Sequence, residues 1–430
     1  MSTFSKLTRG RVLSRSVIAA ALAFGTAGAM VATAAPAAAK DAAPQLSSGF
    51  RALAGPLQKD LGELAKKKGD AAFATSVKAK VAAAIAAAQT PDDKFYAGQF
   101  AIQYGTAADD NAVQKQGLEL ALASGKLPAA DVGKFNYYLG AAAFNAKDYT
   151  GARTAFANAM QAGYQDPEMP ALLAESYFNT NAPDQGLDIL MKGIEAKRAA
   201  GAAAPEAWYR RGLGVAYNAK KLDWAARFSN ALVSAYPTKQ NWSGALSVVR
   251  MVGNYQPQEM LDLFRLMDRA GGFNEGAEYL DYLTVADPRR LPGESLKIID
   301  RGIAAGMIKA TDSFVAESRT NANSRIAADK ASLPGLERDA RAASATAALA
   351  MAAGDAFLSY DNAATAEAMY QIALTKPGVD QGRALTRLGI AQVDQGKTAE
   401  AQASFNKVTG VRKPIAELWG IYAAQKAKGG

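Results

Sequence analysis

The sequence predicts an all-α fold, a superhelical stack (α-solenoid) of antiparallel helix pairs. From residue 136 onward, apolar residues recur at helical spacing in successive blocks. Short segments of turn-forming residues separate these blocks, among them NAKDY, NTNAPD and TKPGVD. No stretch alternates polar and apolar residues for long enough to predict a strand. These three observations favour short helices joined by tight turns.

An internal repeat explains the spacing of the blocks. Each of four positions has a counterpart of the same size class 34 residues later: Leu139 and Leu173, Ala152 and Gly186, Phe156 and Leu190, Ala159 and Gly193. One helix pair cannot bury its apolar face alone, so neighbouring pairs must stack. Close helix crossing requires small residues, with a large one filling the space beside them. We therefore expect Gly140, Ala152 and Ala159 at helix contacts, with Phe156 wedged between them.

These blocks resemble the tetratricopeptide repeat. Its pattern places Leu-Gly or Leu-Ala and an aromatic residue in a first helix, then small, large and small residues in a second. The best match has the following residues: Leu385, Leu388, Gly389, Ala401 and Phe405. It departs from the pattern at Gln392, where the family has an aromatic residue. Equivalent residues of the preceding block lie 35 positions earlier: Gly354, Ala366 and Tyr370. The resemblance implies a superhelix whose first helices line a concave, ligand-binding face.

The strength of the pattern divides the chain into segments. The predicted organisation is as follows: a signal peptide at 1–39, an N-terminal helical cap at 40–92, a divergent tetratricopeptide-like array at 93–307, a polar helical connector or insertion at 308–346, two C-terminal repeats with a capping helix at 347–424, and a basic tail at 425–430. The repeat pattern fails in 308–346, which is polar and is expected to form a longer helix or an insertion.

The N-terminal segment predicts export. A basic leader from Lys6 to Arg15 precedes an apolar stretch, Val17 to Thr33, and the small residues of AAPAAAK predict cleavage after Ala39. The alternative is an uncleaved membrane anchor, but the many small residues favour removal. We expect a periplasmic or secreted protein with no stable membrane span after cleavage.

Composition excludes much chemistry. The 430 residues include no Cys and no His, which removes thiolate nucleophiles, imidazole bases and most zinc and haem ligand sets. The leader holds four of the 49 basic residues and none of the 40 acidic ones, so the remaining chain carries about +5. Its basic residues are scattered, whereas a nucleic-acid surface needs a clustered stripe. We expect no nucleic-acid partner, no cofactor and no metal.

The resemblance assigns partner-binding candidates to the inner faces of the first helices. They are Tyr137, Phe144, Asn145, Glu175, Phe178, Asn179, Tyr209, Tyr217 and Arg250. Aromatic side chains with a polar group suit peptide recognition, although the same residues can simply pack between helices. The asparagines that end first helices can bind a peptide backbone, or they can close their helices in the left-handed conformation, which we favour.

The resemblance implies a scaffold or adaptor that binds a protein or peptide, and the leader predicts the cell envelope as its compartment. Because the signal for a catalytic constellation is weak throughout, we expect no enzyme. A second hypothesis is an accessory domain of an envelope polysaccharide or cell-wall system that binds, or cleaves, a glycan polymer. Cleavage would need two carboxylates such as Glu175 and Asp355 as acid and base. A third is a superhelix that only spaces two other components.

Overall fold

The computed structural model describes residues 44–64, 66–67 and 69–429. These residues form 20 α-helices and one 3-10 helix, without a strand, so the predicted all-α stack of helix pairs is confirmed. The chain divides after Leu190 into unit 1 and unit 2, and the boundary lies within a helix that both share. The predicted signal peptide, 1–39, lies outside the described residues.

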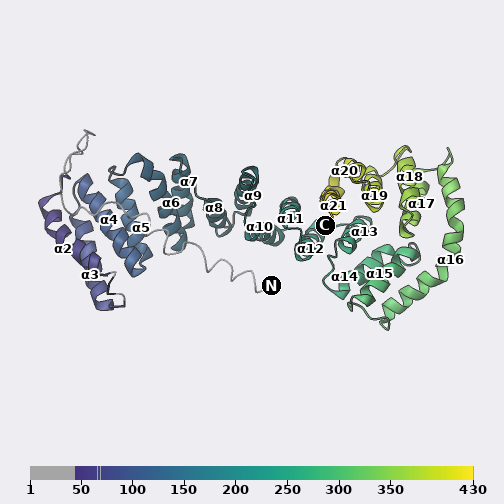
Figure 1. Ribbon diagram of the computed structural model, residues 1–430, viewed down its shortest axis with the longest axis horizontal. Helices are drawn as coiled ribbons and strands as arrows, with labels where there is room; N and C mark the ends of the chain where they lie inside the picture. Colours follow the sequence, from purple (N-terminus) through teal and green to yellow (C-terminus); the bar gives the residue numbers. More distant parts are fainter. Residues whose placement is uncertain (1–43, 65, 68, 430) are drawn as a thin grey trace. The chain divides into compact units, whose positions relative to one another are not determined.

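The helices of each unit follow in chain order (Figure 1). Unit 1 contains α2 (Ser48–Leu64), α3 (Ala71–Ala87), α4 (Pro91–Ala108), α5 (Asn111–Ala123), α6 (Ala129–Asn145), α7 (Tyr149–Gln161), α8 (Met169–Phe178) and the first part of α9 (Pro183–Ala199). Unit 2 contains the rest of α9, then α10 (Glu206–Asn218), α11 (Leu222–Ala235), α12 (Lys239–Gly253), α13 (Pro257–Arg269), α14 (Gly276–Ala286), α15 (Pro292–Ala304), α16 (Ser313–Arg341), α17 (Ala347–Ser359), α18 (Ala363–Leu374), α19 (Gln381–Asp394), α20 (Thr398–Phe405), η2 (Gly410–Arg412) and α21 (Lys413–Lys426).

Short polar side chains in the turns determine where many helices begin. Asp110 and Asp148 precede α5 and α7, and each carboxylate accepts a hydrogen bond from a backbone N–H three residues later. Thr90 and Asp93 form a reciprocal capping box at the start of α4. Such caps satisfy amide groups that have no partner within the helix.

The turn within a helix pair contains one residue in the left-handed region. It is Lys147 (φ 63°) after α6 and Asn181 (φ 56°) after α8. Our preferred interpretation of Asn145, Asn179 and Asn218 as the left-handed closing residues is therefore wrong, because that conformation occurs two residues after each of them. The chain leaves each helix through further right-handed residues before it turns, so the position in the turn outweighs the preference of asparagine.

Glycine–aromatic contacts hold the two helices of several pairs together. A Cβ atom built on Gly140 would lie 2.6 Å from Cδ1 of Phe156, and one on Gly389 would lie 2.4 Å from Cε1 of Phe405. Gly212 and Gly354 make the same contact with the aromatic residue 16 positions later. No side chain fits in this space, because real Cβ atoms do not approach other atoms so closely. The expected register, with its buried wedge at Phe156, is confirmed.

Unit 1 is built by packing between neighbours in the sequence. Its main contacts join each helix from α2 to α7 with the next one, and they also join α2 with α4 and α6 with α8. Lysines of one pair reach the capping aspartates of the following pair: Nζ of Lys78 lies 2.7 Å from Oδ2 of Asp110, and Nζ of Lys115 lies 3.2 Å from Oδ2 of Asp148. Unit 1 is therefore a linear array of helix pairs.

Unit 2 contains contacts between segments that are far apart in the sequence. The C-terminal helix α21 packs on α11, α13 and α19, and α13 also packs on α19. Trp419 of α21 is fully buried, and its Nε1 donates a 3.0 Å hydrogen bond to the carbonyl of Asp262 in α13. Gln425 accepts from Nε1 of Trp242 and donates to the carbonyl of Val233. The end of the chain thus closes unit 2 around α13.

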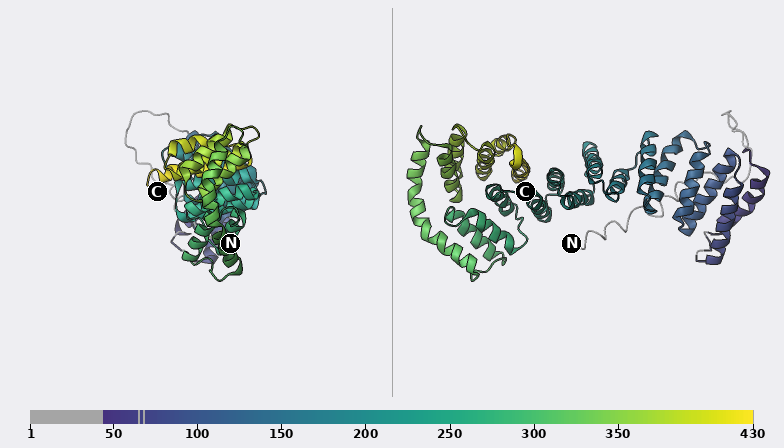
Figure 2. Two further views of the ribbon diagram at one scale, coloured as in Figure 1. Left: turned by 90° about the vertical axis from the view of Figure 1, so that its right-hand side faces the viewer. Right: turned by 180° about the vertical axis from the view of Figure 1, so that it is seen from behind.

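The segment 308–346 contains the longest helix of unit 2. The 29-residue α16 contacts α14, α15, α17 and α18 and leaves most of its side chains exposed. Figures 1 and 2 show α16 along the outer side of unit 2, between α15 and α17. Among residues 44–64, 66–67 and 69–429, no helix is both long enough and apolar enough to cross a membrane.

Candidate functional site

Two of the predicted binding residues are part of the core. Tyr137 and Tyr209 each expose 2% of their surface. The ring of Tyr137 packs against Phe156 and Tyr164, with centroids 5.9 and 5.4 Å apart, and Tyr209 packs edge-on against Tyr236. Assigning these two side chains to a binding surface is therefore wrong, because packing between helices has already covered them.

Five other candidates lie on α6 and α8 or at their C-terminal ends. Asn145 and Asn179 are exposed, and Phe144, Glu175 and Phe178 are half-buried. Phe144 contacts Tyr149 edge-on, and Phe178 occupies the space beside Gly186. The exposed asparagines and the partly open side chains give this face of unit 1 both polar and apolar groups, so partner binding here stays a prediction.

The last two candidates belong to unit 2. Tyr217 is half-buried near the end of α10. Arg250 lies in α12, where its Nη1 is 3.0 Å from Oδ2 of Asp281 and its Nη2 is 3.6 Å from Oε1 of Glu278. Its guanidinium also lies 5.8 Å from the ring centroid of Phe264. These contacts hold Arg250 within unit 2.

A cluster of buried charges connects α13 with the C-terminal repeats; we call it the ion cluster. Its members are Glu259, Asp262, Arg265, Glu294, Asp355, Arg387 and Arg412. Asp262 is central, since its carboxylate accepts from Nε of Arg387 at 2.9 Å and also from Nη1 of Arg412. Asp262, Arg265 and Arg387 are fully buried. Buried charges require this kind of pairing, because an unpaired one is strongly destabilising.

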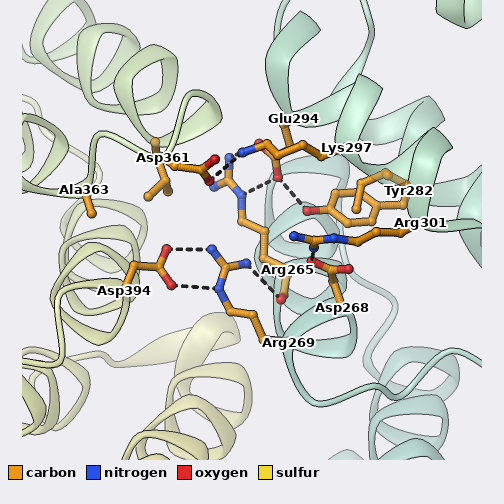
Figure 3. Close-up of a pocket in the computed structure, with 12 residues that line it drawn as sticks. Arg265, Asp268, Arg269, Tyr282, Glu294, Lys297, Arg301, Asp361, Ala363 and Asp394 are labelled. Carbon is orange, nitrogen blue, oxygen red and sulfur yellow. Dashed lines mark hydrogen bonds and ion pairs between the residues drawn. The ribbon is translucent and has the colours of Figure 1, made fainter.

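Along the C-terminal half of α13 lies a pocket of about 290 Å³ with mainly charged walls (Figure 3). We call it the polar pocket. Four cation–carboxylate pairs line it: Arg265–Glu294, Arg269–Asp394, Lys297–Asp361 and Arg301–Asp268. Each of its cations already has a carboxylate partner, so the lining has no excess charge with which to bind an ion.

The carboxylates near α13 are held in the ionised form. Burial favours the neutral form of Glu294, but the charge and hydrogen bonds of Arg265, with the hydroxyl of Tyr282, lower its pKa to about 2. Burial also opposes ionisation of Asp355, yet the charges of Arg387 and Arg383 lower its pKa. A general acid needs a raised pKa. This environment therefore gives no support to Asp355 as the acid of a glycan-cleaving pair.

A second pocket, of about 510 Å³, lies along the N-terminal half of α13; we call it the apolar pocket. Its walls are mostly aliphatic: Leu261, Val285, Ala286, Leu291, Ala347, Ala348, Met351, Ala352 and Ala356. Arg290, Arg383, Asp355 and Asp380 add charge. Pockets of this size with apolar walls and a few polar groups are typical of ligand sites.

Sequence reasoning missed both pockets and the ion cluster. The segment LDLFRLMDR gave no local signal for the cluster, because Asp262, Arg265 and Arg269 lie on one polar face of an amphipathic helix. A polar face of this kind normally faces solvent, whereas here Asp262 and Arg265 are fully buried. The partners, Arg387 and Arg412, are 125 and 150 residues away and no local pattern identifies them. In the described part of the chain, no group of three or more acidic side chains is arranged to hold a metal ion.

No protein-family model matches the sequence, and no curated protein matches it. A solved structure, the crystal structure of the APC/C hetero-tetramer Cut9–Hcn1, aligns over 89% of this chain and 86% of that chain, with 13% identity and a TM-score of 0.20. At this TM-score we draw no conclusion about fold or function from the similarity. The chain is described as tetratricopeptide-like because of its own succession of helix pairs, together with the glycine–aromatic contacts within them.

Proposed function

We propose that this protein is an exported, non-enzymatic scaffold that holds a protein or peptide partner in the cell envelope. The observation that carries the proposal is the array of tetratricopeptide-like helix pairs, joined by glycine–aromatic contacts such as Gly140–Phe156. Arrays of this kind present an extended surface made of successive first helices. Export is supported by the N-terminal sequence alone, and the family of the partner is left open.

Unit 1 offers the better surface for a macromolecular partner. In unit 2, Arg387 of first helix α19 binds Asp262 of α13 as well as Asp355 of α17, so α13 covers part of the face that the resemblance assigns to a ligand. In unit 1, the polar candidates Asn145, Glu175 and Asn179 on α6 and α8 or at their C-terminal ends are exposed or half-buried, whereas the half-buried Phe144 and Phe178 also pack against the second helices α7 and α9. We assign the partner to this face.

A direct test captures partners from an envelope extract with the full chain and with an Asn145→Ala, Glu175→Gln, Asn179→Ala variant. Polar surface changes alter stability by only about 0.5 kcal/mol, so the variant should keep its helicity. A matched control is Asn323→Ala on the exposed side of α16. The proposal predicts a defined protein set that the control retains and the triple variant loses. Equal capture by all three proteins would contradict the site.

Export is tested separately. Cell fractionation followed by N-terminal sequencing should find a chain that begins at Lys40 outside the cytoplasm. A cytoplasmic chain that still contains residues 1–39 would overturn this part of the proposal and leave the scaffold role intact.

A further inference from the structure

The apolar pocket of unit 2 remains open where α13 leaves first helix α17 uncovered. Ala348 and Ala352 lie one turn apart on α17, and both side chains line the pocket and are exposed. Met351 lines the same wall. Across from α17 the wall comes from Leu261 of α13 and from the end of α14. The pocket can therefore accept an apolar group without displacing a helix.

Two arginines of the pocket lining, Arg290 and Arg383, can contact a negative group of a ligand. Arg290 is exposed at the rim and makes no salt bridge within the described residues. Arg383, with 24% of its side chain exposed, has Asp355 as its carboxylate partner at 2.6 Å. Asp355 is also bound by Arg387 at 2.6 Å, so one carboxylate serves two guanidinium groups.

The two acidic groups that line the pocket are already engaged. Asp355 accepts from both arginines and from the hydroxyl of Tyr370 at 2.8 Å. Asp380 caps α19, with its Oδ1 2.9 Å from the backbone nitrogen of Arg383. Burial and the charge of Arg387 together lower the pKa of Arg383. The buried Nε of Arg383 also has no hydrogen-bond acceptor in the described structure.

We propose that the apolar pocket binds a small amphiphilic carboxylate, with its apolar body against Ala348, Met351 and Ala352 and its carboxylate toward Arg290 and Arg383. The pocket volume of about 510 Å³ lies within the usual range for small ligands. Arginine suits the charged end, since its planar guanidinium binds carboxylates through paired hydrogen bonds. This site is independent of the partner surface on α6 and α8.

The test uses the full chain with isotope-labelled methionine methyl groups, titrated with octanoate. The proposal predicts a saturable shift of the Met351 methyl resonance, whereas Met160, which is 58% exposed in unit 1, stays in place. Octan-1-ol, of equal length without charge, should bind several-fold more weakly. No saturable shift at Met351, or parallel shifts at both methionines, would overturn the proposal. Equal affinity for octan-1-ol would overturn the assignment of a carboxylate.

Three variants sharpen the result. Ala352→Trp fills the pocket and should abolish octanoate binding, while Ala83→Trp, at an exposed alanine of α3, should leave it unchanged. Arg290→Gln keeps the shape of the rim and should weaken octanoate binding about two- to fivefold. This difference from the unchanged protein should become smaller at high salt, because salt screens the charge of an exposed arginine. Binding that survives Ala352→Trp would contradict the site. A Met351 shift that depends on protein concentration without octanoate would instead indicate a second copy of the chain in the pocket, and would also contradict the proposal.

Discussion

Unit 1 and unit 2 use the same helix pairs but are stabilised differently. Unit 1 is held by contacts between successive helices, supplemented by exposed pairs such as Lys80–Asp60. Unit 2 adds contacts across 125 to 157 residues, between α13 and the helices α19 and α21. The same repeat can therefore form an open array, in which a destabilising substitution affects only neighbouring helices. It can also form a closed unit, in which helices far apart in the sequence stabilise one another.

The largest expected effect comes from removing α21. Deletion of residues 413–430 uncovers α11 and α13 and removes Trp419, whose loss alone should cost about 3–5 kcal/mol. We expect unit 2 to unfold as a whole while unit 1 keeps its helices, measured by circular dichroism and limited proteolysis. Deletion of residues 1–87, which removes α2 and α3, is the matched control and should leave unit 2 intact. If unit 2 stayed folded without α21, the proposal that α21 holds unit 2 closed around α13 would be wrong.

Breaking the ion cluster should have the next largest effect. Asp262→Asn leaves Arg387 and Arg412 buried without their shared carboxylate, which should cost about 3–5 kcal/mol in chemical denaturation. Asp60→Asn breaks the exposed pair with Lys80 in unit 1 and should cost less than about 1 kcal/mol. Similar costs for the two variants would show that the cluster does not stabilise unit 2.

Substitutions at the glycine–aromatic contacts should have smaller effects that differ in extent between the units. Gly140→Leu and Gly389→Leu both place a side chain against an aromatic ring, at Phe156 and Phe405, and each should cost about 1–3 kcal/mol. In unit 1 we expect faster hydrogen exchange only in adjacent helices. In unit 2 exchange should also rise in α13. If Gly140→Leu increased hydrogen exchange across as many helices of unit 1 as Gly389→Leu does in unit 2, the proposed difference between the two units would be wrong.

A further difference between the units concerns their response to acid. Because the pKa of Glu294 is lowered from 4.5 to about 2 in the folded state, its ionisation stabilises unit 2 fully above about pH 4.5, and this contribution is lost as the pH falls toward 2. Glu294→Gln should flatten the dependence of unfolding free energy on pH in that window. Glu63→Gln, at an exposed pair with Lys66 in unit 1, is the control. Identical pH profiles for Glu294→Gln and the unchanged protein would contradict this assignment.

The sequence was informative where contacts are local and repeated. Helical spacing and the small-large-small pattern predicted the helix pairs, and the wedge at Phe156 follows from packing between adjacent helices. The preference of asparagine for left-handed turns gave the wrong residue, because the geometry of the turn selects Lys147 and Asn181.

Closure of unit 2 could not be predicted in the same way. Asp262 needs counter-charges from η2 and α19, and their pairing depends on the tertiary arrangement of helices that no local pattern specifies. Tyr137 and Tyr209 were misassigned for a related reason: an aromatic residue at helical spacing fits a binding face or a core equally well until its neighbours are known.

The most direct test of closure is hydrogen exchange, monitored by mass spectrometry, in the full chain and in Trp419→Ala. The indole of Trp419 is fully buried and bonds to the backbone of α13. Closure predicts that protection falls together in α13, α19 and α21 while α6 and α7 are unchanged. A loss of protection confined to α21 would show that the end of the chain only covers unit 2 and does not hold it closed.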